Sequence, residues 1–347
     1  MLHERGNGIV HVAVDLAIEQ SRAGHAVTVA APSGDYVDLL RTHGVRHVSL
    51  PQTGGANAAV AVFRLASLVR RDRTDIVHAH MVTGAFIGYS ACTLTATRLI
   101  TTVHNSWQRQ AIGMRLGDHV IAVSDAVRRD MIQRGIPAAK ITTVLNGTLG
   151  SARMRAATGA APPTLDHPAV LTVAGLNTRK GIADLIEAAV ILRERVPGVK
   201  VYLAGDGPER AQFQQLARDR GVEGTVVFLG FCRDAEGVMR QADVFVLASH
   251  ADPNPLVIPE ARAAGLPIVA TAVGGIPESL DGGSAGLLVP PRAPRALADA
   301  LARVLTDTDL RDRMRDQASS NLGWLTVGRM TDDTLAVYRV AIGRLGR

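Results

Sequence analysis

Short apolar runs alternate with helical segments along this chain of 347 residues, and the alternation occurs in two successive blocks. A run such as 244–247 carries apolar side chains on both faces, which is typical of a strand buried in a parallel sheet. The alternation of strand and helix predicts an α/β fold with parallel sheets. A chain of this length can form two domains that each bury a core of their own.

The first block spans residues 1–150, where we expect an N-terminal Rossmann-like domain. Its expected strands are 27–31, 45–50, 76–79, 99–103, 120–123 and 141–145. Its expected helices are 10–22, 36–43, 58–70, 83–96 and 125–133. Residues 151–167 have no apolar period and contain two adjacent prolines, which predicts a linker.

The second block spans residues 168–323 and predicts a second Rossmann-like domain. Its expected strands are 170–173, 199–204, 226–229, 244–247, 268–270 and 286–289. Its expected helices are 182–194, 208–220, 236–240, 259–264 and 294–305. Residues 324–347 form a tail that is predicted to be helical.

Charge is distributed unevenly between the two halves. Residues 1–150 hold 15 Lys and Arg against 10 Asp and Glu, a net charge of +5 out of +6 for the whole chain. A basic first half indicates an anionic partner, such as a phospholipid surface or a diphosphate-linked acceptor. An ordinary solvated basic face is the alternative. We expect no nucleic-acid partner, because no basic stretch is interleaved with aromatic residues for stacking.

Cysteine content and hydropathy bear on location. Cys92 and Cys232 are far apart and match no metal-binding spacing, which fits a reducing cytoplasm. No uncharged apolar run is long enough to span a bilayer. We therefore expect a cytoplasmic protein, with peripheral attachment to the inner face of the membrane as an open alternative.

Residues 249–265, SHADPNPLVIPEARAAG, carry the most informative motif. Pro259 suits the first position of a helix and Gly265 suits its end. A helix N-terminus attracts phosphate, and a carboxylate such as Asp252 or Glu260 accepts hydrogen bonds from sugar hydroxyls. The segment therefore predicts a nucleotide-sugar site, the alternative being an ordinary strand, loop and helix with charged ends.

This segment resembles the donor-site signature of retaining glycosyltransferases of family four, which have the GT-B fold. The family usually has Glu at the position of Asp252 and Met at that of Arg262. Further resemblances follow in family order at 75–80, 101–105, 120–124, 146–148, 180–181, 205–208 and 273–278. The resemblance covers nearly the whole chain. It implies two Rossmann-like domains with a donor and acceptor cleft between them, and a tail that crosses back onto the first domain.

The resemblance also implies the roles of individual residues. Three are expected to be catalytic: His104 faces the reacting sugar, Lys180 neutralises the leaving diphosphate, and Asp252 bonds the donor sugar. The acceptor side is expected to include His80 and Asn105. Glu260 is expected to hold the ribose hydroxyls. The other expected donor-site residues are Gly8, Gly175, Arg179, Gly205, Gly207, Asn254, Leu256, Thr271 and Gly274.

The implied activity is transfer of a sugar from a nucleoside diphosphate sugar to a lipid-linked or polysaccharide acceptor, without a metal or other cofactor. One alternative is a catalytically weak relative that binds nucleotide sugar or joins an assembly complex. It is favoured by Asp252, by a missing first strand and by Gly175, which stands where the family usually has Arg, with Arg179 as a substitute cation. The presence of His104, Lys180 and Glu260 opposes it. An epimerase of the same shape is a further alternative, which the signature around Glu260 disfavours.

The start of the chain departs from the family pattern. The family has a first apolar strand before its glycine loop, whereas here the chain begins almost at the loop of residues 6–8. We therefore expect the first, central strand to be missing, and the coding sequence to continue upstream of Met1.

Overall fold

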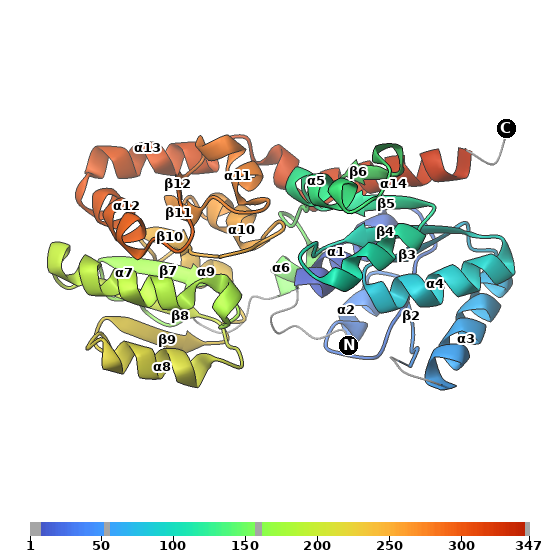
Figure 1. The fold of residues 1–347 in the computed structure, drawn as a ribbon, viewed down its shortest axis with the longest axis horizontal. Helices are drawn as coiled ribbons and strands as arrows, with labels where there is room; N and C mark the ends of the chain where they lie inside the picture. Colours follow the sequence, from blue (N-terminus) through green and yellow to red (C-terminus); the bar gives the residue numbers. More distant parts are fainter. Residues whose placement is uncertain (1–7, 52–55, 157–161, 344–347) are drawn as a thin grey trace. The chain divides into compact units, whose positions relative to one another are not determined.

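The computed structural model describes residues 8–51, 56–156 and 162–343, which belong to two compact units (Figure 1). Unit 1 comprises residues 1–153 and 324–347, and unit 2 comprises residues 154–323. The chain of unit 1 is therefore discontinuous, whereas unit 2 is one continuous segment. The stretch expected to be a linker begins with a short helix, α6 (Ala152–Ala156).

All strand pairs of unit 1 in the described residues are parallel, and they form two sheets. The smaller sheet pairs β1 (Thr28–Ala30) with β2 (Arg46–Val48). The larger has the order β3 (Ile76–Ala79), β4 (Arg98–Val103), β5 (His119–Ala122) and β6 (Ile141–Thr143). Each lies where an apolar run predicts it. Residues 1–7 lie outside the described residues. The expectation that the first strand is missing, and most of the expected glycine loop at residues 6–8, fall in this part of the chain. Gly8 alone of the loop is described.

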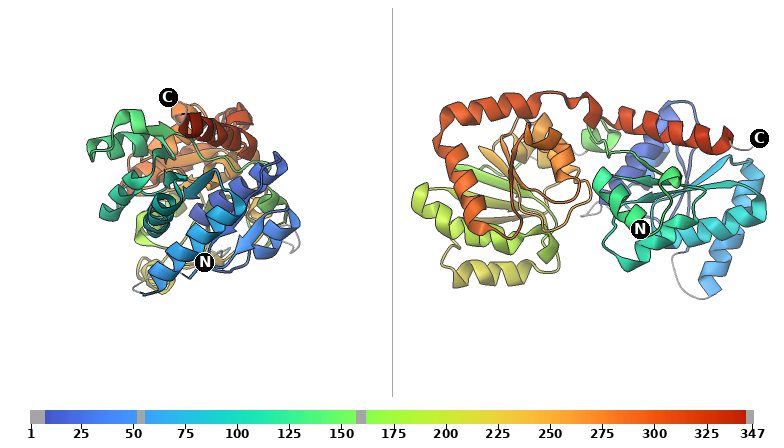
Figure 2. Two further views of the ribbon diagram at one scale, coloured as in Figure 1. Left: turned by 90° about the vertical axis from the view of Figure 1, so that its right-hand side faces the viewer. Right: turned by 45° about the horizontal axis from the view of Figure 1, so that its top comes forward.

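Helices cover these sheets, and α3 packs beside α4 (Figures 1 and 2). The α-helices are α1 (Gly8–Arg22), α2 (Val37–Thr42), α3 (Ala56–Asp72), α4 (Val82–Thr95), α5 (Asp125–Gln133) and α14 (Val327–Gly343). Three short 3-10 helices are η1 (Arg109–Leu116), η2 (Ala138–Lys140) and η5 (Leu322–Leu325). The C-terminal helix α14 packs against α1, so the tail forms part of unit 1.

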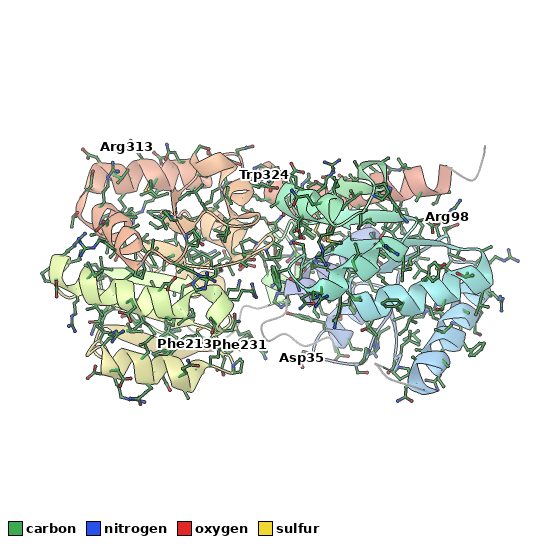
Figure 3. All side chains as sticks on the ribbon, viewed as in Figure 1. Asp35, Arg98, Phe213, Phe231, Arg313 and Trp324 are labelled. Carbon is green, nitrogen blue, oxygen red and sulfur yellow. The ribbon has the colours of Figure 1, made fainter. Side chains whose placement is uncertain are left out.

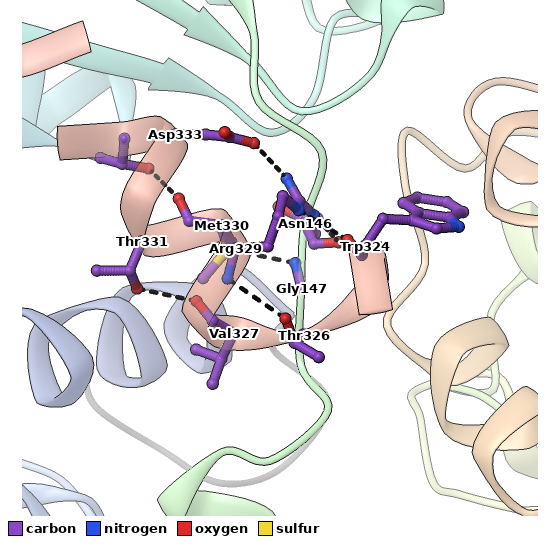
Figure 4. A network of polar contacts seen from close by, with 10 residues as sticks. Asn146, Gly147, Trp324, Thr326, Val327, Arg329, Met330, Thr331 and Asp333 are labelled. Carbon is purple, nitrogen blue, oxygen red and sulfur yellow. Dashed lines mark hydrogen bonds and ion pairs between the residues drawn. The ribbon is translucent and has the colours of Figure 1, made fainter. Parts of the chain in front are cut away.

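The returning segment is anchored at Gly147, in the loop after β6 (Figure 4). A side chain at this position would place its Cβ 2.0 Å from the carbonyl oxygen of Thr326, so only glycine fits. The Gly147 amide faces the sulfur of Met330 at 3.3 Å. Beside it, Leu149 and Thr326 form a parallel bridge, and the Val327 amide donates to the Leu149 carbonyl at 3.1 Å.

Unit 2 contains a six-stranded parallel sheet with the order β12-β11-β10-β7-β8-β9. Its strands are β7 (Ala169–Val173), β8 (Lys200–Ala204), β9 (Val226–Gly230), β10 (Val244–Leu247), β11 (Ile268–Thr271) and β12 (Leu287–Val289). The strand order reverses between β7 and β10. Loops that follow the two central strands diverge there, and ligands of open α/β sheets bind at this point.

Apolar cores fill both faces of the unit 2 sheet; Figure 3 labels Phe213, from the core that also includes α7 and α12. The helices are α7 (Ile182–Arg195), α8 (Arg210–Asp219), α9 (Ala235–Met239), α10 (Val257–Ala263), α11 (Ile276–Ser279), α12 (Pro294–Thr306) and α13 (Thr308–Ser319), with 3-10 helices η3 (Thr178–Lys180) and η4 (Asp281–Gly283).

Several helices of unit 2 differ from the sequence expectation. Helix α8 begins at Arg210, two residues after its expected start, and α11, of four residues, was not among the expected helices. Helix α10 begins at Val257, two residues before the expected start at Pro259. Proline is still tolerated there, because the first turn of a helix has no internal partners for its amides. Helix α13 was not among the expected helices, although the side chain of Asp307 caps it by accepting from the Leu310 amide at 2.9 Å.

Candidate functional site

The loops after β7 and β10 lie side by side at the switch point of unit 2, and each carries one expected catalytic residue. Lys180 ends η3 and Asp252 follows β10, and the Lys180 Nζ lies 2.5 Å from the Asp252 Oδ2. Their side chains are only 15% and 5% exposed. Ser249 also donates to the same carboxylate oxygen at 3.3 Å. The structure thus places the two residues in a nearly buried ion pair.

A glycine allows this approach. Gly181 has a φ of +66°, in the left-handed region that favours glycine. A Cβ there would lie 1.9 Å from the carbonyl oxygen of Ala248, at the end of β10. Gly181 therefore sets both the turn into α7 and the distance between the two loops that carry Lys180 and Asp252.

Arg179 and His250 add two further contacts between the same loops. The Arg179 Nη1 donates to the carbonyl of Ala251 at 2.9 Å, and the His250 amide donates to the Arg179 carbonyl at 2.8 Å. The His250 ring lies 2.7 Å from the Asp184 Oδ2. Gly175, where the family has Arg, accepts the Asn177 amide at 3.0 Å. Arg179 therefore contacts the loop after β10, a position that sequence reasoning left undetermined.

The remaining expected donor-site residues of unit 2 lie at the carboxyl ends of its strands. Gly205 and Gly207 follow β8, and the Gly205 amide donates to the Gly230 carbonyl at 2.7 Å. Thr271 ends β11 and donates to the Ser249 carbonyl at 2.6 Å. Gly274 packs against the Asp252 carbonyl.

Three more lie just before α10 or within it. Asn254 is buried and accepts a hydrogen bond from Ser279 at 3.1 Å. Leu256 caps α10 and accepts the Glu260 amide at 3.3 Å, so Glu260 lies in the first turn of this helix. All of these residues surround the same end of the sheet.

Arg262, where the family has Met, is completely buried beneath this end of the sheet. Its guanidinium donates to the carbonyls of Ala318, Ser279 and Ser320 at 3.1, 2.9 and 2.8 Å, and to the Asp281 Oδ2 at 2.9 Å. It thereby joins α10 to the end of α13 and to η4. The departure from the family signature was visible in the sequence, but this structural role was not.

In unit 1, His80 and His104 follow the adjacent strands β3 and β4, so the structure brings two expected residues together. The His80 Nδ1 lies 3.1 Å from the His104 Nε2, and the rings stack with centroids 5.3 Å apart. Burial lowers the pKa of His80 to about 4 and that of His104 well below its usual value. Both rings are therefore neutral near pH 7, and one nitrogen of the pair donates while the other accepts.

His78 extends this cluster through partners that the sequence analysis missed. Its Nδ1 lies 2.6 Å from the hydroxyl of Tyr338 on α14, and its Nε2 lies 2.7 Å from the Thr102 hydroxyl. Gln20 of α1 donates to the same Tyr338 hydroxyl at 3.2 Å. Burial lowers the pKa of His78 as well. The only sequence signal was the spacing of His78 and His80, which places both on one face of a strand.

Two other expected residues of unit 1 are placed without defined contacts. Gly8 begins α1, and a Cβ there would meet no atom within 4 Å. Asn105 directly follows His104 and is half-buried. Within residues 8–51, 56–156 and 162–343, no group of three or more His, Cys, Asp or Glu side chains is arranged to hold a metal ion.

Comparison with known proteins agrees with this architecture. The model of the glycosyl transferases group 1 matches residues 160–321, and that of glycosyltransferase family 4 matches residues 6–148. The D-inositol 3-phosphate glycosyltransferase of Saccharomonospora viridis is 30% identical, over 94% of this chain and 87% of its own. The chain belongs to the group 1 glycosyltransferases. It is therefore an enzyme of the glycosyltransferase class.

Solved structures show that this glycosyltransferase has the GT-B fold. A glycosyltransferase from Rickettsia africae is 20% identical and superposes with a TM-score of 0.81, over 98% of this chain and 97% of its own. The Anabaena protein HepE, solved in complex with UDP and glucose, is 22% identical with a TM-score of 0.79, over 96% of this chain and 97% of its own. No helix in the described parts of the chain has the length and hydropathy needed to cross a membrane.

Proposed function

We propose that this glycosyltransferase moves a sugar from a nucleoside diphosphate sugar to a lipid-linked or polysaccharide acceptor, with retention of the anomeric configuration. We place the reaction in the cytoplasm and propose that it needs no metal or other cofactor. The observation that carries the donor assignment is the pair formed by Lys180 and Asp252 at the switch point of unit 2.

The surroundings of this pair suit a nucleoside diphosphate sugar. The ammonium group of Lys180, which is paired with Asp252 in this structure, has the charge to bind a diphosphate, and the carboxylate of Asp252 can accept hydrogen bonds from sugar hydroxyls. Glu260 is the proposed acceptor for the ribose hydroxyls, from the first turn of α10. The likeness to HepE, whose structure contains UDP and glucose, supports the same ligand class.

The proposed transfer breaks the bond between the sugar C1 and the β-phosphate oxygen, and the electron pair leaves on that oxygen. Lys180 neutralises the charge that develops there. The acceptor hydroxyl oxygen forms the new bond to C1 on the same face of the ring, and its proton passes to the leaving phosphate. The products are a nucleoside diphosphate and a glycoside.

His104 and His80 supply hydrogen bonds in this proposal. Because burial keeps both rings neutral, they can orient sugar or acceptor hydroxyls through hydrogen bonds alone, without adding a charge. Asn105, which follows His104, is the neighbouring polar group on the proposed acceptor side.

The test begins with a donor screen by calorimetry, using UDP-, GDP-, ADP- and TDP-sugars. Each donor that binds is then incubated with a membrane extract, with polysaccharide and with D-inositol 3-phosphate, the compound for which the Saccharomonospora relative is named. NMR of the product gives its anomeric configuration, and addition of EDTA tests the metal requirement. We expect one preferred donor, a product with the anomeric configuration of the donor, and full activity in EDTA.

Each part of the proposal can fail separately. Tight donor binding without transfer to any acceptor would support the catalytically weak alternative. An inverted product would overturn the proposed mechanism but leave the donor assignment intact. Loss of turnover in EDTA would overturn the metal-free proposal.

A further inference from the structure

The exposed apolar side chains of this enzyme are concentrated in unit 1. In the described residues, nine large apolar side chains are at least 41% exposed, and all of them belong to unit 1. They are Val60, Phe63, Met81, Phe86, Tyr89, Leu94, Trp107, Val340 and Ile342. Five of the nine lie on the neighbouring helices α3 and α4.

These two helices form one continuous face. They pack together through buried residues that include Ala66, Val69 and Ala91, and they lie side by side in Figures 1 and 2. Phe63 of α3 is 69% exposed, and Phe86 of α4 is 55% exposed. We call the outward surface formed by Val60, Phe63, Phe86, Tyr89 and Leu94 the α3–α4 face.

Helix α4 has the surface chemistry of a helix adapted to a weakly polar medium. Its sequence, VTGAFIGYSACTLT, contains no Asp, Glu, Lys, Arg or His. Three of its five hydroxyl groups bond back to its own carbonyls: Ser90 to Phe86 at 3.1 Å, Thr93 to Tyr89 at 2.9 Å and Thr95 to Ala91 at 2.9 Å. Because these donors already have partners, the helix can leave water without losing them.

Cations surround this apolar surface. Arg64, Arg70 and Arg71 lie on the exposed side of α3, and the Arg70 Nη2 donates to the Leu94 carbonyl at the end of α4 at 2.5 Å. On the other side, the ring edge of Phe86 lies over Gly113 of η1, a helix that carries the exposed Arg109 and Arg115. The acidic residue of these three helices is Asp72 at the end of α3, and it is paired with Arg71 and Arg46.

We propose that the α3–α4 face docks this enzyme on an anionic phospholipid bilayer. Aromatic and aliphatic side chains enter the interfacial layer, and the surrounding arginines bind phosphate headgroups. A second copy of the chain is a poorer occupant, because pairing this face with itself would bring arginines of both copies together, while Asp72 is already paired with Arg71 and Arg46. The proposal uses no residue of the transfer site and does not depend on the donor or the acceptor.

The experiment is flotation of the full chain with vesicles of phosphatidylcholine alone, and with vesicles that also contain phosphatidylglycerol. We expect binding to the anionic vesicles that weakens strongly in high salt. The double variant F63S/F86S should lower the partition coefficient by about tenfold or more. The variant R64Q/R71Q should lower it several-fold on anionic vesicles only.

The matched control is V340S/I342S, which removes two exposed apolar side chains of unit 1 from α14, outside the α3–α4 face. This control should bind like the unchanged chain. Donor binding by calorimetry should be the same in all variants, so failure of the docking proposal and failure of the proposed function are distinguishable.

Three results would overturn the proposal. They are equal binding to neutral and anionic vesicles, equal loss in V340S/I342S and F63S/F86S, and absence of vesicle binding. In the last case, gel filtration that shows an oligomer broken by F63S/F86S would identify a second copy as the occupant instead.

Discussion

Both units are built on parallel sheets, but the carboxyl ends of their strands carry different chemical groups. In unit 2 these ends carry paired charges, of which Lys180 and Asp252 are the central pair. In unit 1 they carry neutral imidazoles, His80 and His104, joined by a hydrogen bond. The large apolar side chains that are exposed in the described residues also belong to unit 1 alone.

This contrast shows that a parallel sheet specifies where a site lies but not what it binds. Fixed opposite charges suit a ligand of constant charge, such as a diphosphate. Neutral imidazole rings can form hydrogen bonds with the hydroxyl groups of an uncharged ligand, and an apolar surface suits a lipid. The side chains placed on similar strands and helices therefore differ in charge and polarity between the units.

The largest expected effect tests the buried charge of unit 2. Arg262→Ala should lower the free energy of unfolding by about 3–5 kcal/mol, because Asp281 and three buried carbonyls lose their donor. Urea unfolding followed by circular dichroism measures it. Both tryptophans, Trp107 and Trp324, belong to unit 1, so their fluorescence reports on that unit separately.

Arg313→Ala, on the exposed side of α13, is the matched control and should change the free energy of unfolding by less than about 0.5 kcal/mol. A similar loss of unfolding free energy in both variants would show that the buried hydrogen bonds of Arg262 do not stabilise unit 2.

The next effect compares the charged site with the neutral one. Lys180→Ala should lower kcat by about 10²- to 10³-fold, since the leaving diphosphate loses its cation. His104→Ala removes a neutral hydrogen bond and should cost only about tenfold. Steady-state kinetics with the preferred donor measures both. Arg179→Ala is the control for loss of a neighbouring cation, and a loss there as large as in Lys180→Ala would contradict our assignment.

Acid should weaken unit 1 selectively. The pKa of His80 is about 4 in the folded chain against a usual 6.5, so the unfolded chain binds its proton first. Stability is therefore lost as pH falls from 6.5 to 4, by about 3 kcal/mol from His80. His78 and His104 act in the same direction. Tryptophan fluorescence during urea unfolding at pH 7 and pH 4.5 measures this loss.

Asp15 of α1 opposes the acid effect. Burial raises its pKa from 3.8 to about 6, even though Arg153 lies 3.3 Å away. The folded chain therefore binds this proton first, and stability is regained as pH falls from 6 to 4. Asp15→Asn should make the free energy of unfolding of unit 1 fall more steeply between pH 6 and pH 4. An unchanged dependence on pH would contradict this.

Unit 2 offers a comparison at the same pH. Burial raises the pKa of Tyr202 and of Cys232 there, and because both groups stay protonated below pH 7, they do not make the stability of unit 2 depend on pH in this range.

The smallest effect concerns the contact between α14 and β3. Tyr338→Phe removes the hydroxyl that joins His78 to Gln20, and should lower the stability of unit 1 by about 1 kcal/mol. The same fluorescence assay measures it. Tyr89→Phe removes the hydroxyl of an exposed tyrosine and should leave the stability of unit 1 unchanged. An equal loss of stability in the two variants would show that the hydrogen bonds of Tyr338 do not stabilise unit 1.

Much of the fold could be predicted because a buried parallel strand is apolar on both faces. Each strand of the structure overlaps a run expected from the sequence, and the ends differ by at most two residues. Helix α13 was missed because its sequence, TDLRDRMRDQAS, of which half the residues are charged, lacks a clear apolar stripe. Helix α6 was missed because five residues are too short to show a period.

The candidate site could be predicted only in part. The motif indicated Lys180 and Asp252 separately, but their pairing depends on β7 and β10 being neighbours, which sequence spacing does not reveal. The partner of His78, Tyr338, lies 260 residues further along the chain. Arg262 was recognised as a departure from the family signature, yet its four hydrogen bonds reach residues of η4, α11 and α13, which only the tertiary fold brings together.

The discontinuity of unit 1 has a consequence for how this enzyme is made. The ribosome synthesises residues 154–323, the whole of unit 2, before it synthesises α14. Until then Gly147 has no Met330 to face, and His78 has no Tyr338 to bond. Synthesis of unit 1 therefore begins before that of unit 2 and ends after it. A chain truncated before α14 and released from the ribosome is expected to hold a folded unit 2 together with a unit 1 that a protease can still cut.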